Sequence, residues 1–438
     1  MILIKNGRVV DPVAAKDSVK DILIDGDHII LVKDNIQTDH DMEKDLQIID
    51  ADGLVVAPGL TDAHVHFRDP GQTYKEDIET GAAAAAKGGF TTVVCMANTR
   101  PPVDSTETLD YILKKGSGTG IHVLQTSAIT KGLKGQELVD MHAMADAGAA
   151  GFTDDGIPIM DENILVQAMK TARELDLPVS LHEEDPLFIS RPGVNQGKIS
   201  EQLDYGGASR TAEDVMVARD TILALHTGAS VCIQHISSGN SVALVRNARQ
   251  LGADVHAEAT PHHFTLTEEA VLKYGTMARM NPPLREEADR LAIIEGIKDG
   301  TIDMIVTDHA PHSAGEKARP LEKAPSGITG LETSLALGIK SLVQPGHITL
   351  LKLMELMSRN PMEFYRRKPV SITPGSAADL VIFGENELWT VDHFASKASN
   401  SPFAGWELPG KIHYTICGGK IVYQSDVEAA SSDELAKN

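Results

Sequence analysis

The sequence predicts an α/β protein in which a (β/α)8 TIM barrel carries a small β-sandwich domain built from both ends of the chain. Two observations predict this fold. Apolar runs of strand length alternate with helical stretches through the middle of the chain, whereas short strands joined by turns occupy both ends. With 438 residues, the chain is long enough for one large domain and one smaller domain.

The N-terminal residues 1–55 are predicted to form the first part of the small domain. They contain short apolar runs separated by two dipeptides, Asn6-Gly7 and Asp25-Gly26. Both dipeptides are typical of tight hairpin turns, because asparagine, aspartate and glycine tolerate the positive φ that such turns require. The sequence therefore predicts hairpins at these two positions.

Residues 365–425 have the same character and are predicted to form the second part of the small domain. Apolar runs of strand length recur there, and Gly418-Gly419 joins the last two of them. The residues that follow, 426–438, are small and polar, and we expect them to form a flexible tail.

The barrel is predicted over residues 56–364. Consecutive strand–helix units are typical of a (β/α)8 barrel, in which the carboxyl ends of the strands carry the active site. A doubly wound open sheet is the alternative, but it would not bring residues from five separate strands to one point. The predicted strands are 54–60, 91–96, 121–125, 150–153, 178–181, 230–234, 253–257 and 303–307, with helical stretches such as 75–87, 161–175, 211–227 and 286–299 between them.

Composition excludes several classes of protein. Hydrophobic residues make up 42% and charged residues 23%, as in a soluble globular protein. No apolar run approaches the roughly 18 residues of a membrane span, and the N-terminus lacks the pattern of a signal peptide. A net charge of −22 argues against nucleic-acid or anionic-membrane partners. Three isolated cysteines fit free thiols in a reducing compartment, so we expect a cytoplasmic protein.

Residues that can bind metal ions follow several of the predicted strands. His64-Val65-His66 is weak evidence alone, although positions i and i+2 of a strand point to one face. Other ligand-type residues strengthen it, and imidazole with carboxylate suits zinc. The set is larger than one catalytic zinc needs, so two metals sharing a carboxylate would account for it. The candidates are His64, His66, Asp154, Asp155, His182, His235 and Asp308.

Several longer motifs extend over essentially the whole chain. Two of them are Asp62-Ala-His-Val-His-Phe-Arg68 and Thr307-Asp-His-Ala-Pro-His312. On these motifs together, the chain resembles the dihydroorotases of the amidohydrolase superfamily, specifically the bacterial type with an aspartate bridge. The complete set of matching segments is 62–71, 96–104, 151–156, 181–185, 234–237, 258–264, 280–285, 307–312 and 327–333.

The resemblance implies two Zn²⁺ ions per subunit. One ion would be held by His64, His66, Asp155 and Asp308, and the other by Asp155, His182 and His235. Asp155 would bridge the two ions, whereas the residues alone do not choose between it and Asp154. We expect Asp154 to be structural.

The resemblance also implies a set of substrate contacts. The guanidinium of Arg68 is suited to bind the carboxylate of dihydroorotate with two hydrogen bonds. One departure is visible, because the family usually has Pro-Phe-Gly where this chain has Pro325-Ser-Gly327, so an apolar wall is lost. The implied substrate-binding residues are His66, Arg68, Asn98, Asn281, His312, Ser326 and Gly327, the last two partly through the main chain.

The implied reaction is the reversible zinc-dependent hydrolysis of (S)-dihydroorotate to N-carbamoyl-L-aspartate in de novo pyrimidine (UMP) biosynthesis, with Asp308 as the catalytic proton carrier. Two alternatives stay open. A cyclic amidase for allantoin or a hydantoin is disfavoured because the fourth strand position, Phe152-Thr-Asp-Asp, has no lysine to bridge the metals. A non-catalytic subunit that scaffolds an aspartate transcarbamoylase is disfavoured because every ligand is present. We expect a homodimer, and docking of an active enzyme on an aspartate transcarbamoylase stays open.

The segment 313–325 reads as a long polar loop without helical periodicity on the active-site face. Loops of this length over an active site often act as lids, so we expect substrate to order it. A surface loop packed elsewhere is the alternative.

Overall fold

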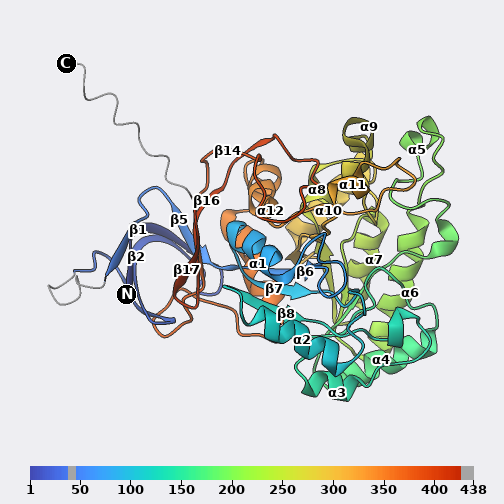
Figure 1. Cartoon of the computed structure of the whole chain (residues 1–438), viewed down its shortest axis with the longest axis horizontal. Coiled ribbons are helices and arrows are strands. Elements are labelled where there is room, and N and C mark those ends of the chain that lie inside the picture. The colour runs from blue at the N-terminus through green and yellow to red at the C-terminus, as the bar shows by residue number, and fades with distance from the viewer. Residues whose placement is uncertain (38–45, 426–438) are drawn as a thin grey trace.

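The computed structural model describes residues 1–37 and 46–425, and it confirms the predicted α/β class (Figure 1). Parallel strands alternate with helices through the middle of the chain, and a mixed sheet lies at one end of the molecule. The tail expected at 426–438 falls outside the described residues.

The parallel strands pair in two sets. In the first set β6 (Leu60–Val65), β7 (Phe90–Cys95) and β8 (His122–Gln125) are neighbours; in the second set β9 (Val179–Leu181), β10 (Val231–Ile233), β11 (Val255–Ala259) and β12 (Met304–Ile305) are neighbours. Isolated parallel bridges connect the sets: Phe152 bridges both Ser127 and Val179, and Val65 bridges His309. The residues that follow β12 therefore lie beside the end of β6.

Helices separate the parallel strands where the sequence predicts them. The carboxylate of Asp77 accepts a hydrogen bond from the Thr80 N–H (2.8 Å) and so begins α1, and Gly228 at φ 68° ends α6. None of the described helices is both long and apolar enough to cross a membrane. The helices are α1 (Ile78–Lys87), α2 (Thr106–Gly116), α3 (Met141–Asp146), α4 (Glu162–Glu174), α5 (Lys198–Gln202), α6 (Thr211–Thr227), α7 (Gly239–Gln250), α8 (Pro261–Thr265), α9 (Ala270–Tyr274), α10 (Glu287–Asp299), α11 (Ala314–Lys317), α12 (Ser334–Gly338), α13 (Leu350–Met354) and α14 (Asn360–Phe364), with π-helical turns at Ile339–Val343 and Glu355–Arg359.

The two ends of the chain build one mixed sheet together, in the strand order β17-β16-β13-β5-β1-β2-β3 with β4 paired to β1. Its core contains isoleucine and alanine side chains from both ends, such as Ile4 and Ile382. The predicted sandwich is not confirmed, because within residues 1–37 and 46–425 the two ends share this one sheet. The strands are β1 (Ile2–Asp11), β2 (Lys16–Asp25), β3 (His28–Lys33), β4 (Gln47–Asp50), β5 (Val55–Pro58), β13 (Leu380–Gly384), β16 (Lys411–Cys417) and β17 (Lys420–Gln424), while β14 (Trp389–Thr390) pairs with β15 (Glu407–Leu408).

The predicted first barrel strand, 54–60, is wrong in its bounds. β5 belongs to the mixed sheet, where it pairs with β1 and β13, and the first parallel strand is β6. Gly59 separates them, and a Cβ atom there would come within 2.2 Å of the Thr91 side chain. The sequence could not reveal this break, because a single glycine separates two strands in which every residue is buried.

The hairpin predicted at Asn6-Gly7 is also wrong. β1 continues through both residues, with an irregular register between Ile4 and Gly7. Asn6 does have a positive φ of 60°, and its N–H donates to Asp21 Oδ1 at 2.9 Å. The dipeptide thus marks a bulge, which requires the same φ as a turn. Asp25-Gly26 and Gly418-Gly419 do join neighbouring antiparallel strands, as predicted.

Candidate metal centre and active site

The predicted metal ligands come together at the carboxyl ends of the parallel strands. Each lies in a parallel strand or bridged segment or in the residues just after one, and their side chains are almost completely buried. The predicted ligands are His64 in β6, His66 just after β6, Asp155 after the Phe152 bridge, His182 after β9, His235 after β10 and Asp308 after β12.

Asp155 lies at the centre of this cluster. Its Oδ1 is 3.4 Å from His64 Nε2 and 3.9 Å from His182 Nδ1, and its Oδ2 is 3.6 Å from His66 Nε2. The histidines therefore surround one carboxylate, which is the arrangement expected of a bridging ligand.

The remaining distances complete the cluster. Asp308 Oδ1 is 2.9 Å from His66 Nε2 and 3.6 Å from His64 Nε2. On the other side of Asp155, His182 Nδ1 lies 3.0 Å from His235 Nε2. His235 and Asp308 have φ values of 29° and 45°, in a region that non-glycine residues seldom adopt. Such backbone strain is typical of functional sites held by the surrounding structure.

The donor set fits a divalent cation such as zinc. Two overlapping groups, His64–His66–Asp308 and His64–Asp155–His235, each have their ligand atoms within 4.8 Å of one another. Nε2 of His64 is buried without a hydrogen-bond partner although it faces two carboxylates. Because Nδ1 of this ring lies 3.2 Å from a Glu258 oxygen and donates to it, a proton or a cation must balance the lone pair on Nε2.

Asp155 and His235 have protonation states that favour metal binding, whereas nearby carboxylates outweigh burial and raise the pKa values of His64 and His182. Burial raises the pKa of Asp155, but the charges of His64 and its neighbours outweigh burial and hold the pKa well below its ordinary value. Burial together with His182 and His64 lowers the pKa of His235 well below its ordinary value. An ionised carboxylate and an unprotonated imidazole are the forms that bind metal ions.

Two carboxylates that sequence reasoning missed orient the ligand histidines. Glu258 Oε2 accepts from His64 Nδ1 at 3.2 Å, and Glu184 Oε2 accepts from His182 Nε2 at 3.1 Å. Each bond fixes the ring so that its other nitrogen points into the cluster. Both glutamates lie in motifs of the sequence, but only the fold reveals which histidine each one contacts.

Asp154 points away from the cluster. Its carboxylate accepts hydrogen bonds from the N–H groups of Ile129 (2.7 Å) and Thr130 (3.0 Å) and from the Thr130 hydroxyl. Burial raises the pKa of Asp154 to about 6. These contacts tie Asp154 to residues 129 and 130, away from the cluster, as in a structural residue.

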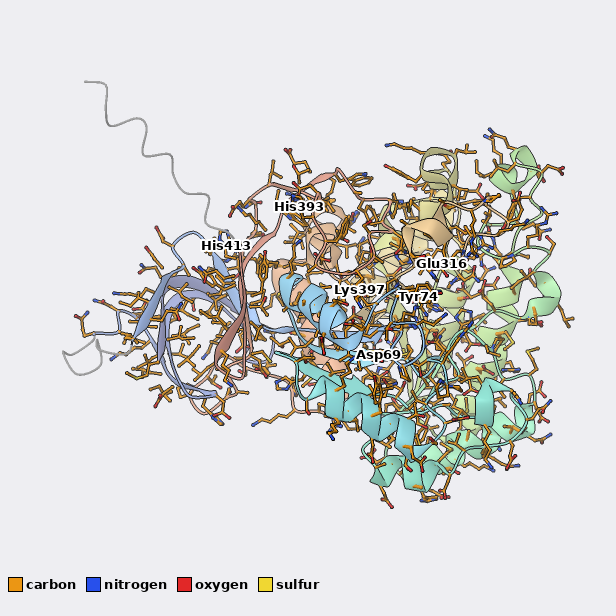
Figure 2. The ribbon with its side chains drawn as sticks, in the orientation of Figure 1. Asp69, Tyr74, Glu316, His393, Lys397 and His413 are labelled. Carbon is orange, nitrogen blue, oxygen red and sulfur yellow. The ribbon has the colours of Figure 1, made fainter. Side chains whose placement is uncertain are left out.

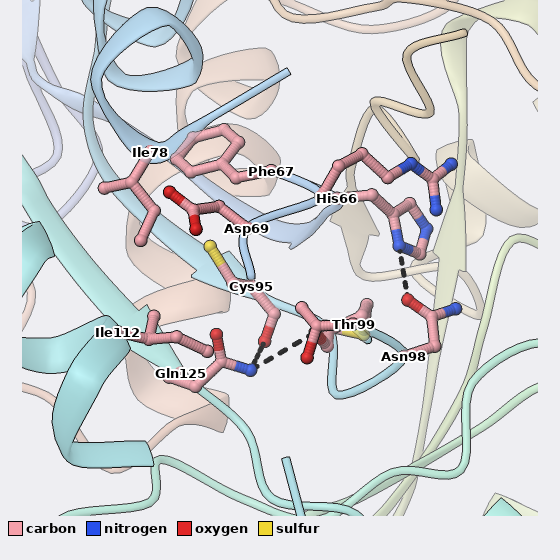
Figure 3. A pocket seen from close by; sticks show the side chains of 11 residues that line it. His66, Phe67, Asp69, Ile78, Cys95, Asn98, Thr99, Ile112 and Gln125 are labelled. Carbon is pink, nitrogen blue, oxygen red and sulfur yellow. Dashed lines mark hydrogen bonds between the residues drawn. The ribbon is translucent and has the colours of Figure 1, made fainter. Parts of the chain in front are cut away.

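A cavity of about 230 Å³ opens beside the cluster. Asn98 links the two: its Oδ1 accepts from His66 Nδ1 at 2.9 Å (Figure 3), and its Nδ2 donates to Asp155 Oδ2 at 2.7 Å. The much smaller cavity in Figure 3, about 10 Å³, lies behind His66 and has room for one water at most. The larger cavity is lined by His66, Arg68, Asn98, Asp155, Gly156, His182, His235, Met280, Asn281, Asp308, Ala310, His312, Ser326 and Gly327, so it contains every predicted substrate-binding residue.

One wall of this cavity carries positive charge. Arg68 has a buried Nε without a hydrogen-bond partner, and burial lowers the pKa of its guanidinium. Lys75, which sequence reasoning missed, donates from Nζ to His312 Nδ1 at 3.2 Å. Burial and the charges of Arg68 and Lys75 lower the pKa of His312 to about 2, so its ring is neutral. This wall is suited to an anion.

Asn281, Ser326 and Gly327 also line the cavity, and hydrogen bonds within the protein hold them in place. The hydroxyl of Ser326 donates to Asn281 Oδ1 at 3.0 Å and leaves the Asn281 amide nitrogen for a ligand. The Ser326 carbonyl accepts from His312 Nε2 at 2.8 Å, and the Gly327 N–H donates to the Arg279 carbonyl at 3.0 Å. Main-chain contacts from 326–327 to a substrate would therefore have to share or replace these bonds.

The segment 313–325 is not the irregular loop that was predicted. It begins with the short helix α11. Ser313 and Glu316 form a capping box at the N-terminus of this helix. Tyr74 donates to Glu316 at 3.1 Å and thereby ties α11 to the loop after β6 (Figure 2). Lys317 is buried, donates to the carbonyls of Pro325 and Gly327, and has a pKa lowered to about 7 by burial. A lid movement stays a prediction.

Comparisons with known proteins agree with this geometry. A sequence profile described as Dihydro-orotase-like matches residues 53–241. A relative from Clostridioides difficile named dihydroorotase is 59% identical over 425 residues, which are 97% of this chain and 100% of the relative. Another relative of the same name, from Clostridium acetobutylicum, is 52% identical with the same coverage. The chain belongs to the dihydroorotase family.

Solved structures similar to this dihydroorotase-family chain support its fold. An L-hydantoinase (dihydropyrimidinase) from Arthrobacter aurescens aligns with a TM-score of 0.85 at 24% identity, covering 97% of this chain and 96% of that one. A D-hydantoinase (dihydropyrimidinase) from Thermus sp. aligns with a TM-score of 0.83 at 22% identity and the same coverage. At this identity the likeness establishes the fold alone.

The bond between Glu258 and His64 leads to a first prediction. Glu258→Gln should weaken zinc binding about 10- to 100-fold, because the amide orients the imidazole less strongly than a carboxylate. Competition with a chromophoric chelator measures this affinity. The matched control is Glu295→Gln, which changes an exposed carboxylate in α10 that pairs with Lys298. Equal affinities for wild type and Glu258→Gln would show that Glu258 does not support the metal ligands.

Proposed function

We propose that this protein is a zinc-dependent dihydroorotase that hydrolyses (S)-dihydroorotate reversibly to N-carbamoyl-L-aspartate, a step of de novo pyrimidine biosynthesis. The observation that carries the proposal is the position of Arg68. Its guanidinium lines the same cavity as the imidazole–carboxylate cluster, and its Nε is buried without a partner. The carboxylate of the substrate would accept a hydrogen bond from this Nε. The substrate ring would then lie beside the imidazole–carboxylate cluster. The names of the close relatives support the same reaction.

The fold assigned to this enzyme is a (β/α)8 barrel with a small β-domain. Phe152 bridges Ser127 and Val179, and Val65 bridges His309. These bridges connect the two sets of parallel strands and so support a closed barrel. We assign residues 59–364 to the barrel and 1–58 with 365–425 to the small domain. The predicted boundary between residues 55 and 56 moves to Gly59, because β5 pairs with β1 and β13 of the mixed sheet.

Two Zn²⁺ ions are the proposed cofactors. His64, His66, Asp155 and Asp308 would hold one ion, and Asp155, His182 and His235 the other. When bound, zinc lowers the pKa of a water to about 7 and withdraws electrons from a carbonyl group. The distances from Asp155 to three of these histidines, all between 3.4 and 3.9 Å, support its role as the bridge.

The side chains of the cavity position the substrate. Arg68 binds the ring carboxylate, and the Asn281 amide nitrogen, left free by the bond from Ser326, donates to the ring. Asn98 keeps its bonds to His66 and Asp155 and closes that side of the cavity. These contacts hold the amide carbonyl over the cluster in one orientation.

Asp308 then moves the proton. It accepts a proton from the attacking water, whose oxygen forms a bond to the amide carbon. As the ring C–N bond breaks, Asp308 gives this proton to the leaving nitrogen, which becomes a terminal urea NH₂, and the new carboxyl group releases the second proton of the water to solvent as it becomes a carboxylate. Ring closure follows the same steps in reverse.

The alternative of a hydantoin- or allantoin-hydrolysing amidase has the fold in its favour, because the solved structures cited above are hydantoinases. The residues that line the cavity argue against this alternative. Neutral rings do not require a buried cation such as Arg68, and leaving that cation unpaired would cost binding energy. The homodimer, a cytoplasmic location and association with an aspartate transcarbamoylase stay predictions.

The proton transfer leads to a second prediction. Asp308→Asn should keep the fold and much of the bound zinc, yet lower kcat at least ~100-fold, the lower range for general acid–base catalysis. Turnover of dihydroorotate, normalised to zinc content and to circular dichroism, measures the effect. Near wild-type turnover at full zinc content would rule out Asp308 as the proton carrier.

The charge on Arg68 leads to a third prediction. Arg68→Gln should weaken the binding of dihydroorotate by about 1.5–3 kcal/mol, the usual contribution of a hydrogen bond to a charged group. Binding of 5,6-dihydrouracil, which has the same ring without the carboxylate, should change much less. Inhibition constants for both compounds test this, with Arg367→Gln on the surface as the control. Equal losses for the two compounds would indicate a structural role for Arg68.

A further inference from the structure

A separate cluster of metal-ligand residues lies away from the candidate active site. It consists of His122 at the start of β8, Asp379 just before β13 and Cys417 at the end of β16. One ligand atom from each of the three residues lies within 4.8 Å of the others. Because His122 begins β8 while the active site lies beyond the ends of the parallel strands, the cluster sits at the opposite end of the barrel. The proposed function leaves it without a role.

The three side chains offer the donor types that zinc binds most often. Thiolate, imidazole and carboxylate form tetrahedral sites in which neighbouring donor atoms are roughly 3.3–3.6 Å apart. His122 Nε2 is already 3.1 Å from Asp379 Oδ2. The Gly418 N–H donates to the other carboxylate oxygen at 2.6 Å, and this bond holds the carboxylate towards the histidine. The Cys417 thiol, which donates to the Thr91 carbonyl at 3.7 Å and lies within 4.8 Å of both ligand atoms, would have to turn towards them to enclose an ion.

The cluster is accessible from one side only. Asp379 and Cys417 are buried, whereas half of the His122 side chain is exposed (52%). A surface cavity of about 640 Å³ adjoins it and is lined by residues from 116–124 together with Cys417 and Gly418. An ion and a fourth, exchangeable ligand such as water can reach the site through this cavity.

The donor types also indicate which ion would bind. One sulfur and one imidazole nitrogen suit zinc or a similar ion, whereas magnesium and calcium prefer oxygen ligands.

We propose that His122, Asp379 and Cys417 form a further zinc site that has no part in catalysis and ties the small sheet to the edge of β8. The site joins residues that are far apart in sequence, since Asp379 and Cys417 belong to the mixed sheet and His122 to the parallel strands (Figure 1). A bound ion would replace the hydrogen bond between them with covalent-like coordination and leave one position open.

Cobalt absorption tests the site directly, because the proposed active-site ligands are all nitrogen and oxygen. A thiolate-to-cobalt charge-transfer band in the near ultraviolet can therefore come only from a cysteine. The full chain is depleted of metal, titrated with Co²⁺ and scanned. We expect the band in wild type, its loss in Cys417→Ser and its loss or strong weakening in His122→Asn. Cys95→Ala, which removes a fully buried core thiol, and His393→Ala, which removes an exposed histidine, should keep it.

Zinc content and activity complete the test. Wild type loaded with zinc should retain one more zinc per chain than Cys417→Ser after dialysis, while both hydrolyse dihydroorotate at the same rate. Retained activity shows that the variant is folded and separates this proposal from the proposed function. Absence of a thiolate–cobalt band in wild type, a band that survives Cys417→Ser, or equal zinc contents would each overturn the proposal.

Discussion

The burial of Asp155 among four histidines is the constraint around which this molecule is arranged. A carboxylate removed from water is tolerated only where positive charge or hydrogen bonds compensate it. Here the compensation comes from imidazoles on β6, β9 and β10, so these strands must end at the same level. His235 and Asp308, which follow β10 and β12, both have positive φ values, so two side chains of the cluster are held by a strained backbone.

The rest of the site divides into two parts of opposite character. Glu258 and Glu184 surround the histidines with negative charge and fix their tautomers, which favours a cation at the centre. Across the cavity, the Arg68 guanidinium supplies positive charge in a protein of net charge −22, and behind the lining residue His312 lies Lys75, which also pairs with Glu316. An anionic ring would thus be attracted locally although the whole surface repels it. One small cavity therefore provides both the affinity for metal and the affinity for a carboxylate.

Much of this could be predicted from the sequence, and the failures have physical causes. Alternation of apolar runs and helices predicted the α/β class, and the ligand residues stood out because polar groups end buried strands. Glu258 was missed since nothing local in its sequence indicates which imidazole it contacts. Asn6-Gly7 was misread because a bulge and a hairpin require the same φ. The cap that begins α11 depends on Ser313 and Glu316 in a segment too short to show helical periodicity.

The central claim is that the imidazole–carboxylate cluster binds zinc and that Arg68 directs a carboxylate-bearing ring onto it. The most direct measurement is the turnover of dihydroorotate and of hydantoin by purified, metal-depleted protein as zinc is added back. The account predicts no turnover without metal, recovery of dihydroorotate hydrolysis that rises with zinc to a plateau, and little or no hydrolysis of hydantoin at any zinc content. Full activity without metal, or a zinc-loaded protein that prefers hydantoin, would contradict it.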